Sequence, residues 1–339
     1  MLDVFNNNAF GVIELAEAMN NIPFKPSRLA EMGLFRTRGI TTTSAAIEQK
    51  DGVLTLIPPT PRGGPGTTIA RGRRSMLDVR IPHFEVNDGV MAEEVQGVRA
   101  FGTEDALLPY QQLVAERGSE HSQNFDVTEE YNRIGAIKGI ITYSDGSTMS
   151  LYTTFDVVQE SEIDFDLDAG SPAAGALRKK CAAVTRQMGG LLGGLPYTYV
   201  HALCGDAFFD DLLAHSEVRD TYKNWSDAQI LRDGYVGPNK SSWGMFEFGG
   251  IVWENYRGNN GATPYIDTNK CHLFPFGVPN LFRTYFAPAD YIETVNTVGK
   301  RLYAKMYPMP NGKGTHLDMQ MNALSICTRP KVLIQGKRT

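Results

Sequence analysis

Residues 104–158 have the sequence EDALLPYQQLVAERGSEHSQNFDVTEEYNRIGAIKGIITYSDGSTMSLYTTFDVV. The apolar residues before Gly139 fall roughly on a helical stripe, which predicts a long helix that ends at this glycine. Residues 140–158 then alternate around an Asp145-Gly146 turn, which predicts a β-hairpin. Because the helix is polar all round between Glu116 and Asn124, we expect it to be poorly buried within its own domain. A long helix followed by a hairpin favours a mixed α+β fold.

A second hairpin is predicted on the N-terminal side of this helix. Residues 40–49 and 52–58 are β-branched and alternating, with an Asp51-Gly52 turn between them. Residues 75–86 alternate again and place Leu77, Val79 and Ile81 on one face of a strand. The basic segment between these strands, PPTPRGGPGTTIARGRRSM (58–76), is therefore predicted to be the tip of a long hairpin.

This tip contains four arginines, Arg62, Arg71, Arg73 and Arg74, and such a segment has three possible interpretations. A phosphate cradle would need a lysine at P-loop spacing and backbone N–H donors, and Pro65 removes one of those donors. A nucleic-acid finger is weakened by the net charge of -5, because phosphate binding needs a large excess of Lys and Arg. Contact with an acidic surface of another protein subunit is the interpretation that the sequence favours.

The remaining segments complete the predicted α+β arrangement. Residues 1–22 are predicted to be an arm, and residues 26–35 a short helix capped by Ser27. Acidic and apolar residues alternate in 160–170, which predicts an edge strand, and 172–189 is predicted to be a helix that begins at Pro172. Residues 315–336 alternate as strands do, and we expect strands from both ends of the sequence to share a sheet.

The composition is that of a soluble globular protein, with 42% hydrophobic and 21% charged residues among 339. We find no apolar run of the length, about 18 residues, that a membrane helix needs. No basic segment precedes an apolar one at the N-terminus, so we expect a native start that stays in a cytoplasm. Cys181, Cys204, Cys271 and Cys327 form no Cys-x-x-Cys pair and are interpreted as small buried residues in a reducing compartment.

The sequence contains no recognisable catalytic motif, and no cofactor or metal is predicted. Asp164-x-Asp166-x-Asp168 copies the first ligands of a calcium loop, but Gly175 stands where the final Glu should be. We therefore interpret these aspartates as an acidic face of a strand. Carboxylate pairs such as Glu129-Glu130 are interpreted as ordinary surface, and His201 and His272 as core or surface residues.

The layout resembles that of the tailed-bacteriophage major capsid proteins of the lambda-type capsid protein E family. The likeness runs almost from end to end. The stretches on which it rests are NNIPFKPSRLAEMGLF (20–35), the hairpin 40–86, VQGVRAFGTEDALLPYQQLVAER (95–117), NFDVTEEYNRIGAIKGIITYSDGST (124–148), EIDFDLD (162–168) and KRLYAKMYPMPNGKGTHLDMQMNALSICTRP (300–330).

The resemblance implies the fold named after phage HK-97. On this basis we expect an N-terminal arm (1–32), an extended hairpin loop (33–100) and a spine helix (101–139). The peripheral domain would comprise 140–172 and 293–339, and the axial domain 173–292. The polar segment 118–122 and the absence of a long charged helix ahead of the arm depart from the family pattern. If Met1 is the true start, scaffolding would come from a separate protein.

The leading functional hypothesis is a non-enzymatic capsid subunit that assembles into hexamers and pentamers of an icosahedral head around double-stranded DNA. One alternative is an encapsulin-type compartment of the same fold, against which the polar arm argues. The other is a soluble enzyme with an unrecognised site.

The resemblance also implies the partners: further copies of the chain, a scaffolding protein during assembly, a portal, and a decoration protein as a further candidate. Packaged DNA would be contacted only non-specifically, and no membrane partner is expected. Assembly would take place in the host bacterial cytoplasm. For the contact between subunits we expect Arg62, Arg71, Arg73 and Arg74 to meet an acidic surface. The candidate surfaces are the acids of 156–168, including Asp164, Asp166 and Asp168, or the run Glu85, Asp88, Glu93 and Glu94.

Overall fold

In the computed structural model, the described residues are 28–50, 74–96, 110–170, 172–223, 244–260 and 263–339. They divide into two compact units. The first contains the described parts of 1–47, 78–133 and 282–326, and the second the described parts of 48–77, 134–281 and 327–339. Each unit therefore joins segments that lie far apart in the sequence.

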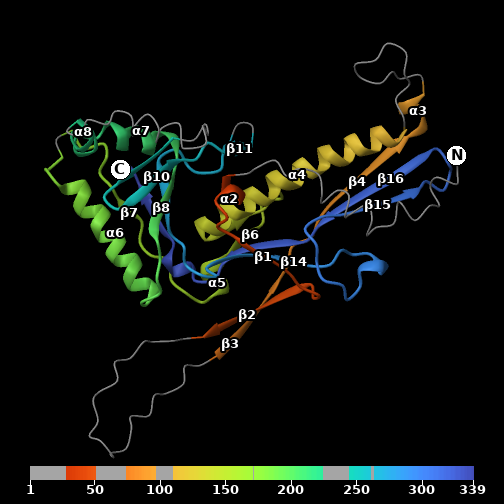
Figure 1. Cartoon of the computed structure of the whole chain (residues 1–339), viewed down its shortest axis with the longest axis horizontal. Coiled ribbons are helices and arrows are strands. Elements are labelled where there is room, and N and C mark those ends of the chain that lie inside the picture. Colours follow the sequence, from red (N-terminus) through yellow and green to blue (C-terminus); the bar gives the residue numbers. More distant parts are fainter. Residues whose placement is uncertain (1–27, 51–73, 97–109, 171, 224–243, 261–262) are drawn as a thin grey trace, which may run out of the picture. The chain divides into compact units, whose positions relative to one another are not determined.

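An antiparallel sheet in the first unit has the strand order β15–β16–β4. Its strands are β15 (Tyr303–Pro308), β16 (Gly314–Met321) and β4 (Phe84–Met91). Alternate residues of β16 point inward, and Leu317, Met319 and Met321 are buried. They pack with Phe125 of the long helix α4 (Tyr110–Lys138), which runs along the strands in Figure 1.

A second small sheet of this unit joins both ends of the sequence, as predicted. Its order is β1 (Arg36–Gly39), β14 (Phe282–Phe286) and β17 (Ala323–Cys327), and β1 is parallel to β14. The short helix α2 (Arg28–Glu31) precedes β1 and buries Leu29.

The second unit contains a mixed six-stranded sheet with the order β7–β18–β13–β8–β10–β9. Its strands are β7 (Ile163–Asp164), β18 (Ile334–Lys337), β13 (Lys270–Phe276), β8 (Tyr199–Cys204), β10 (Ile251–Asn255) and β9 (Met245–Phe248). The helices of this unit include α6 (Ala176–Leu192), α7 (Asp206–Ala214) and α8 (Ser216–Lys223). Its core contains Phe165, Phe208 and Trp253, whose rings make edge and stacked contacts.

The other elements are short. They are β2 (Ser44–Lys50), β3 (Arg74–Arg80), α3 (Ala92–Val95), β5 (Ile140–Thr142), β6 (Thr148–Ser150), α5 (Leu151–Thr154), β11 (Asn259–Asn260), β12 (Thr263–Pro264), η3 (Ile292–Thr294) and η4 (Pro330–Val332).

Both predicted hairpins are present in the described residues. β2 pairs with β3, and β5 pairs with β6 around the Asp145-Gly146 turn. Val79 and Ile81 are buried while Asp78 and Arg80 are exposed, as the alternation predicted. The basic tip up to residue 73 and the Asp51-Gly52 turn lie outside the described residues.

Three predicted boundaries were wrong. Residues 151–154 form the helix α5 and not a strand, because the Ser150 hydroxyl accepts a hydrogen bond from the Thr153 N–H and caps a helical turn. In 160–170 only Ile163 and Asp164 form a strand, and the backbone of Asp166 turns with a φ of 47°. The helix predicted from Pro172 begins at Ala176, whereas its end at Leu192 lies within the glycine-rich run 189–194, as predicted.

Helix α4 is continuous through its polar middle and ends before Gly139, as predicted. Gly139 has a φ of 78°, and a Cβ there would lie 2.5 Å from the Tyr152 ring. The expectation of poor burial was wrong for the C-terminal half of α4, where residues 132–137 are all buried. Charged side chains in this half of α4 pair with other residues of the same unit. The spacing of apolar residues in the sequence does not predict such pairs.

Candidate subunit-contact surfaces

Within the described residues, no group of three or more His, Cys, Asp or Glu side chains could hold a metal ion. No helix of the described part is both long and apolar enough to span a bilayer. The four cysteines are buried and unpaired, as predicted, and burial raises the pKa of Cys181 and of Cys327 to about 12.

The two histidines examined in the sequence are core residues of the six-stranded sheet. His201 is 1% exposed, and its Nε2 lies 3.0 Å from Oε2 of the buried Glu254. Burial, with the charges of Lys138 and Lys270, lowers the pKa of His272 to about 3. His272 is therefore neutral at physiological pH.

The predicted acidic surface at 156–168 is partly neutralised within the chain. Asp164 pairs with Lys337 at 3.0 Å, and Lys180 pairs with the Asp166 carboxylate and donates to the Asp164 carbonyl at 2.7 Å. Burial raises the pKa of Asp164, but the Asp166 N–H and Lys337 outweigh this and leave it below the ordinary value. Asp168 is exposed. Of the predicted arginines, Arg74 begins β3, and the other three lie outside the described residues.

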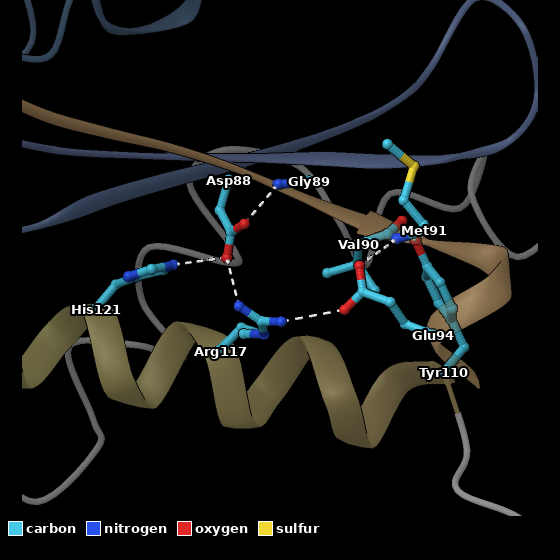
Figure 2. Close-up of polar contacts among 8 residues, drawn as sticks. All are labelled: Asp88, Gly89, Val90, Met91, Glu94, Tyr110, Arg117 and His121. Atoms are coloured by element: carbon cyan, nitrogen blue, oxygen red, sulfur yellow. Dashed lines mark hydrogen bonds and ion pairs between the residues drawn. The ribbon is translucent and has the colours of Figure 1, made fainter. Parts of the chain in front are cut away.

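Two acids of the second predicted run, Asp88 on β4 and Glu94 on α3, face the N-terminal half of α4 (Figure 2). His121 Nε2 lies 2.8 Å from Asp88 Oδ2, and Arg117 Nη1 lies 3.7 Å from the same oxygen. Arg117 also donates to Glu94 Oε2 at 3.1 Å. Nearer the start of the helix, the Tyr110 hydroxyl donates to the Val90 carbonyl at 3.0 Å. The polar middle of α4 is thus attached to a strand by ion pairs and hydrogen bonds.

Asp88 is the centre of this cluster and is held as a carboxylate. Its Oδ1 accepts a hydrogen bond from the Gly89 N–H at 2.7 Å (Figure 2). Partial burial raises the pKa of Asp88, but the bonds from His121 and Gly89 and the charge of Arg117 together lower it below the ordinary value. Arg117 follows Tyr110 by seven positions and His121 follows Arg117 by four, so the three side chains lie on one face of the helix. This spacing is the sequence pattern that could have indicated a polar face of α4 in contact with a neighbour.

A second charged network lies in the C-terminal half of α4, at carboxylates that the sequence predicts to be ordinary surface. Glu129 is 2% exposed and accepts from Arg301 Nε at 2.8 Å, and Arg133 also pairs with it. Arg301 reaches Asp126 as well. The carboxylate of Glu130 accepts the Leu29 N–H at 3.1 Å, which fixes α2 on α4. The interpretation of Glu129-Glu130 as surface was wrong because their partners are distant in the sequence.

Several large apolar side chains remain exposed on the single chain. They are Met76, Met91, Val127, Ile140, Val158, Ile292, Val295, Val298 and Tyr307. Scattered exposed apolar residues are normal, but three of these fall within seven residues of one another, at 292–298.

Comparisons with known proteins agree with the arrangement of these elements. A model of the family described as phage major capsid protein E matches residues 11–338. The major capsid protein of Pseudomonas phage KPP10 is 27% identical over 349 residues, which cover 97% of each chain. The major capsid protein of Salmonella phage Felix O1 is 25% identical over 363 residues, which cover 98% of each chain.

Solved structures show the same fold at low identity. The capsid of Myoviridae phage XM1 matches with a TM-score of 0.51 and 9% identity, over 97% of this chain and 100% of that chain. The putative capsid protein of a prophage of E. coli CFT073 matches with a TM-score of 0.52 and 11% identity, over 95% and 96%. The fold is therefore the α+β, HK-97-like capsid fold that the resemblance implied.

Proposed function

Because the chain belongs to the phage major capsid protein E family and is a structural protein of the virion capsid, we propose that its copies form the hexamers and pentamers of an icosahedral head around double-stranded DNA. The family match over residues 11–338 is the observation that carries this proposal. The exposed apolar side chains support it, since contacts between identical subunits would cover surface that the single chain leaves in water.

We assign the protein no catalytic role. A scaffolding protein during assembly, a portal and a decoration protein are proposed as partners, with assembly in the host cytoplasm. Packaged DNA is proposed to be contacted without sequence preference, because the net charge of -5 is unfavourable for a phosphate-binding surface over the whole chain.

The proposed domains follow the resemblance. The arm is 1–32, the extended loop 33–100 and the spine helix 101–139, whose described part is α4. The axial domain is proposed to be 173–292, and the presence of 173–281 in one compact unit supports this. The peripheral domain is proposed to be 140–172 with 293–339. Because 134–172 and 327–339 cluster in the same unit as 173–281, the boundary between these two domains is the part to test.

For the arginine tip we propose contact with acids of an adjacent subunit. Asp168 and Glu93 are exposed members of the two acidic candidates, whereas Asp164, Asp166, Asp88 and Glu94 are already paired within the chain. Exposed ion pairs contribute only about 0–1 kcal/mol each. The contact is therefore expected to orient subunits more than to stabilise them.

Electron microscopy and sedimentation of the expressed chain, with and without a scaffolding partner, test the assembly proposal. Closed particles are expected, and a stable monomer under all assembly conditions would contradict it. Changing Arg71, Arg73 and Arg74 together to Glu tests the tip. We expect misdirected or blocked assembly of a folded subunit, and normal assembly when the same three residues are changed to Lys. Normal capsids from the Glu variant would refute the arginine contact alone.

A further inference from the structure

The segment 288–300 presents an apolar surface to solvent on a loop that is held in place. Ile292, Val295 and Val298 are 91%, 64% and 62% exposed. Ile292 and Val295 are three residues apart, and the 3₁₀ turn η3 brings residues of this spacing to the same side. Val298 lies beside β1, since a Cβ at Gly39 would lie 2.7 Å from its Cγ1. Exposed apolar side chains that gather on one segment, unlike those scattered singly, mark a candidate interaction site.

The loop is rigid because its backbone is hydrogen-bonded at several points. The buried Thr294 hydroxyl bonds the Ala289 carbonyl at 2.7 Å, and the Gly299 N–H donates to the Ile40 carbonyl at 2.8 Å. A Cβ at Gly299 would overlap the Phe286 carbonyl, so the close approach of this loop to β14 requires glycine. The apolar side chains are therefore held outward, and a partner would not have to order the loop on binding.

Acidic groups border this apolar surface. Asp290 is exposed, and the Glu293 carboxylate is 47% exposed, with Lys305 at 2.8 Å as its partner. An apolar surface with an acidic rim is unsuited to the phosphates of DNA, which like charges repel. It is suited to a protein surface that presents basic side chains.

Such a basic surface lies next to the loop on the same unit. Arg36 and Arg38 are exposed on β1 and, being two residues apart, point to the same face of the strand. Arg36 stands opposite Arg283 in the parallel register, and Arg38 stands opposite Tyr285, whose hydroxyl Arg283 bonds at 3.1 Å. Like charges directly opposite one another destabilise a sheet. Charged residues on an edge strand also protect it from wrong pairing.

We propose that the acid-rimmed loop 288–298 of one copy docks on the arginine face of a second copy, formed by Arg36, Arg38 and Arg283. A second copy of the chain fits this loop because its arginine face has the opposite charge to the acidic rim of the loop. The Gly299–Ile40 hydrogen bond places them side by side on each copy. Two copies could then contact each other reciprocally, or successive copies could close into a ring. The proposal rests on the proposed function, which supplies the copies.

The test is charge reversal with rescue, read as the yield of closed particles by electron microscopy and sedimentation. The full-length double variants Arg36→Glu with Arg38→Glu, and Asp290→Arg with Glu293→Arg, should each reduce that yield at least tenfold. The chain that combines all four changes should recover at least half of the wild-type yield. Arg186→Glu, at an exposed position of α6, is the matched charge control and should assemble normally.

The apolar part of the contact has its own matched pair of variants. Ile292→Ser with Val295→Ser should reduce particle yield, whereas Ala183→Ser, at an exposed position of α6 in the other unit, should not. Normal yield from both charge-reversed chains, or no recovery in the combined chain, would overturn the proposal. Normal particles that have lost a second, separate protein would also overturn it and assign the loop to that protein.

A cross-link keeps the proposal testable if a charge variant fails to fold. Chains that carry only Arg38→Cys, assembled together with chains that carry only Val295→Cys, should give covalent dimers on oxidation, whereas neither kind of chain should do so by itself. Native thiols should interfere little, since all four cysteines are buried. Only monomers on a non-reducing gel of oxidised particles would overturn the contact. If even the wild-type chain forms no particles, the proposed function fails, while cross-linked free oligomers would still support this contact.

Discussion

Removal of Arg301 should destabilise the first unit strongly, because this side chain compensates two buried carboxylates. Its Nε lies 2.8 Å from Glu129 Oε2, and it also pairs with Asp126. Burial lowers the pKa of Arg301, but the charges and hydrogen bonds of Glu129 and Asp126 raise it by more. The pKa therefore lies above its ordinary value, and the guanidinium stays charged. Arg301→Met would leave Glu129, with a side chain 2% exposed, short of one cation.

Removing one partner of a buried ion pair costs about 3–5 kcal/mol. Arg301 is one quarter exposed, and Arg133 would still donate to Glu129, so we expect about 2–3 kcal/mol for Arg301→Met. Urea unfolding of the unassembled subunit measures this loss. Arg301→Lys keeps the charge but cannot reach both carboxylates as a fork does, and should lose about half as much.

A double-mutant cycle tests the electrostatic origin of the loss. Because Arg301 and Glu129 attract each other, Arg301→Met should cost less in a Glu129→Gln background than in the wild type. A loss below about 1 kcal/mol in the wild-type background would refute the reasoning. An equal loss in both backgrounds would show that Arg301 acts through packing alone.

Three further variants test other parts of the fold by urea unfolding. Gly139→Ala should lose about 2 kcal/mol or more, because φ is 78° and the new Cβ would meet the Tyr152 ring; a loss below 0.5 kcal/mol would contradict this estimate of about 2 kcal/mol. In the folded state the pKa of His272 is lowered from 6.5 to about 3. The contribution of the neutral side chain to the free energy of unfolding is therefore complete above about pH 6.5 and is lost as the pH falls towards 3. His272→Gln should flatten the pH profile in that window, and an unchanged slope would argue against a buried neutral imidazole. The pKa of Asp88 is lowered in the folded state. Its contribution to the free energy of unfolding is therefore present above 3.8, the pKa in the unfolded state, and is lost as the pH falls through the pKa in the folded state. Asp88→Asn should lower the free energy of unfolding by about 1 kcal/mol at neutral pH and change its dependence on pH in the acidic range. An unchanged dependence in that range would count against the cluster with His121 and Arg117.

Much of the fold could be predicted from the sequence wherever local pattern decides the structure. The alternation of 75–81, the Asp145-Gly146 turn and the end of the long helix at Gly139 are all confirmed. Errors arose where a local side-chain bond competed with the pattern. The Ser150 cap converts a predicted strand into α5, and the Asp164 carboxylate accepts the Asp166 N–H at 2.8 Å and helps to turn the acidic segment.

The candidate contact surfaces could be predicted only in part. Arginine and aspartate clusters are visible as runs of letters, but whether a charge is free depends on partners such as Lys337, which is far away in the sequence. The surface at 292–298 gave no sequence signal, because Ile and Val in a short segment are typical of buried and exposed positions alike.

By itself the sequence determined the class of fold, the order of its hairpins and long helix, and the resemblance to a capsid family. These follow from periodicity and turn residues, which report the local path of the chain. Only the tertiary structure decided that Glu129 is buried and meets Arg301, 172 positions away, and that Ile292 remains in water. The physical reason is that burial and ion pairing depend on which distant segments meet, and neighbouring residues in the sequence do not specify that meeting.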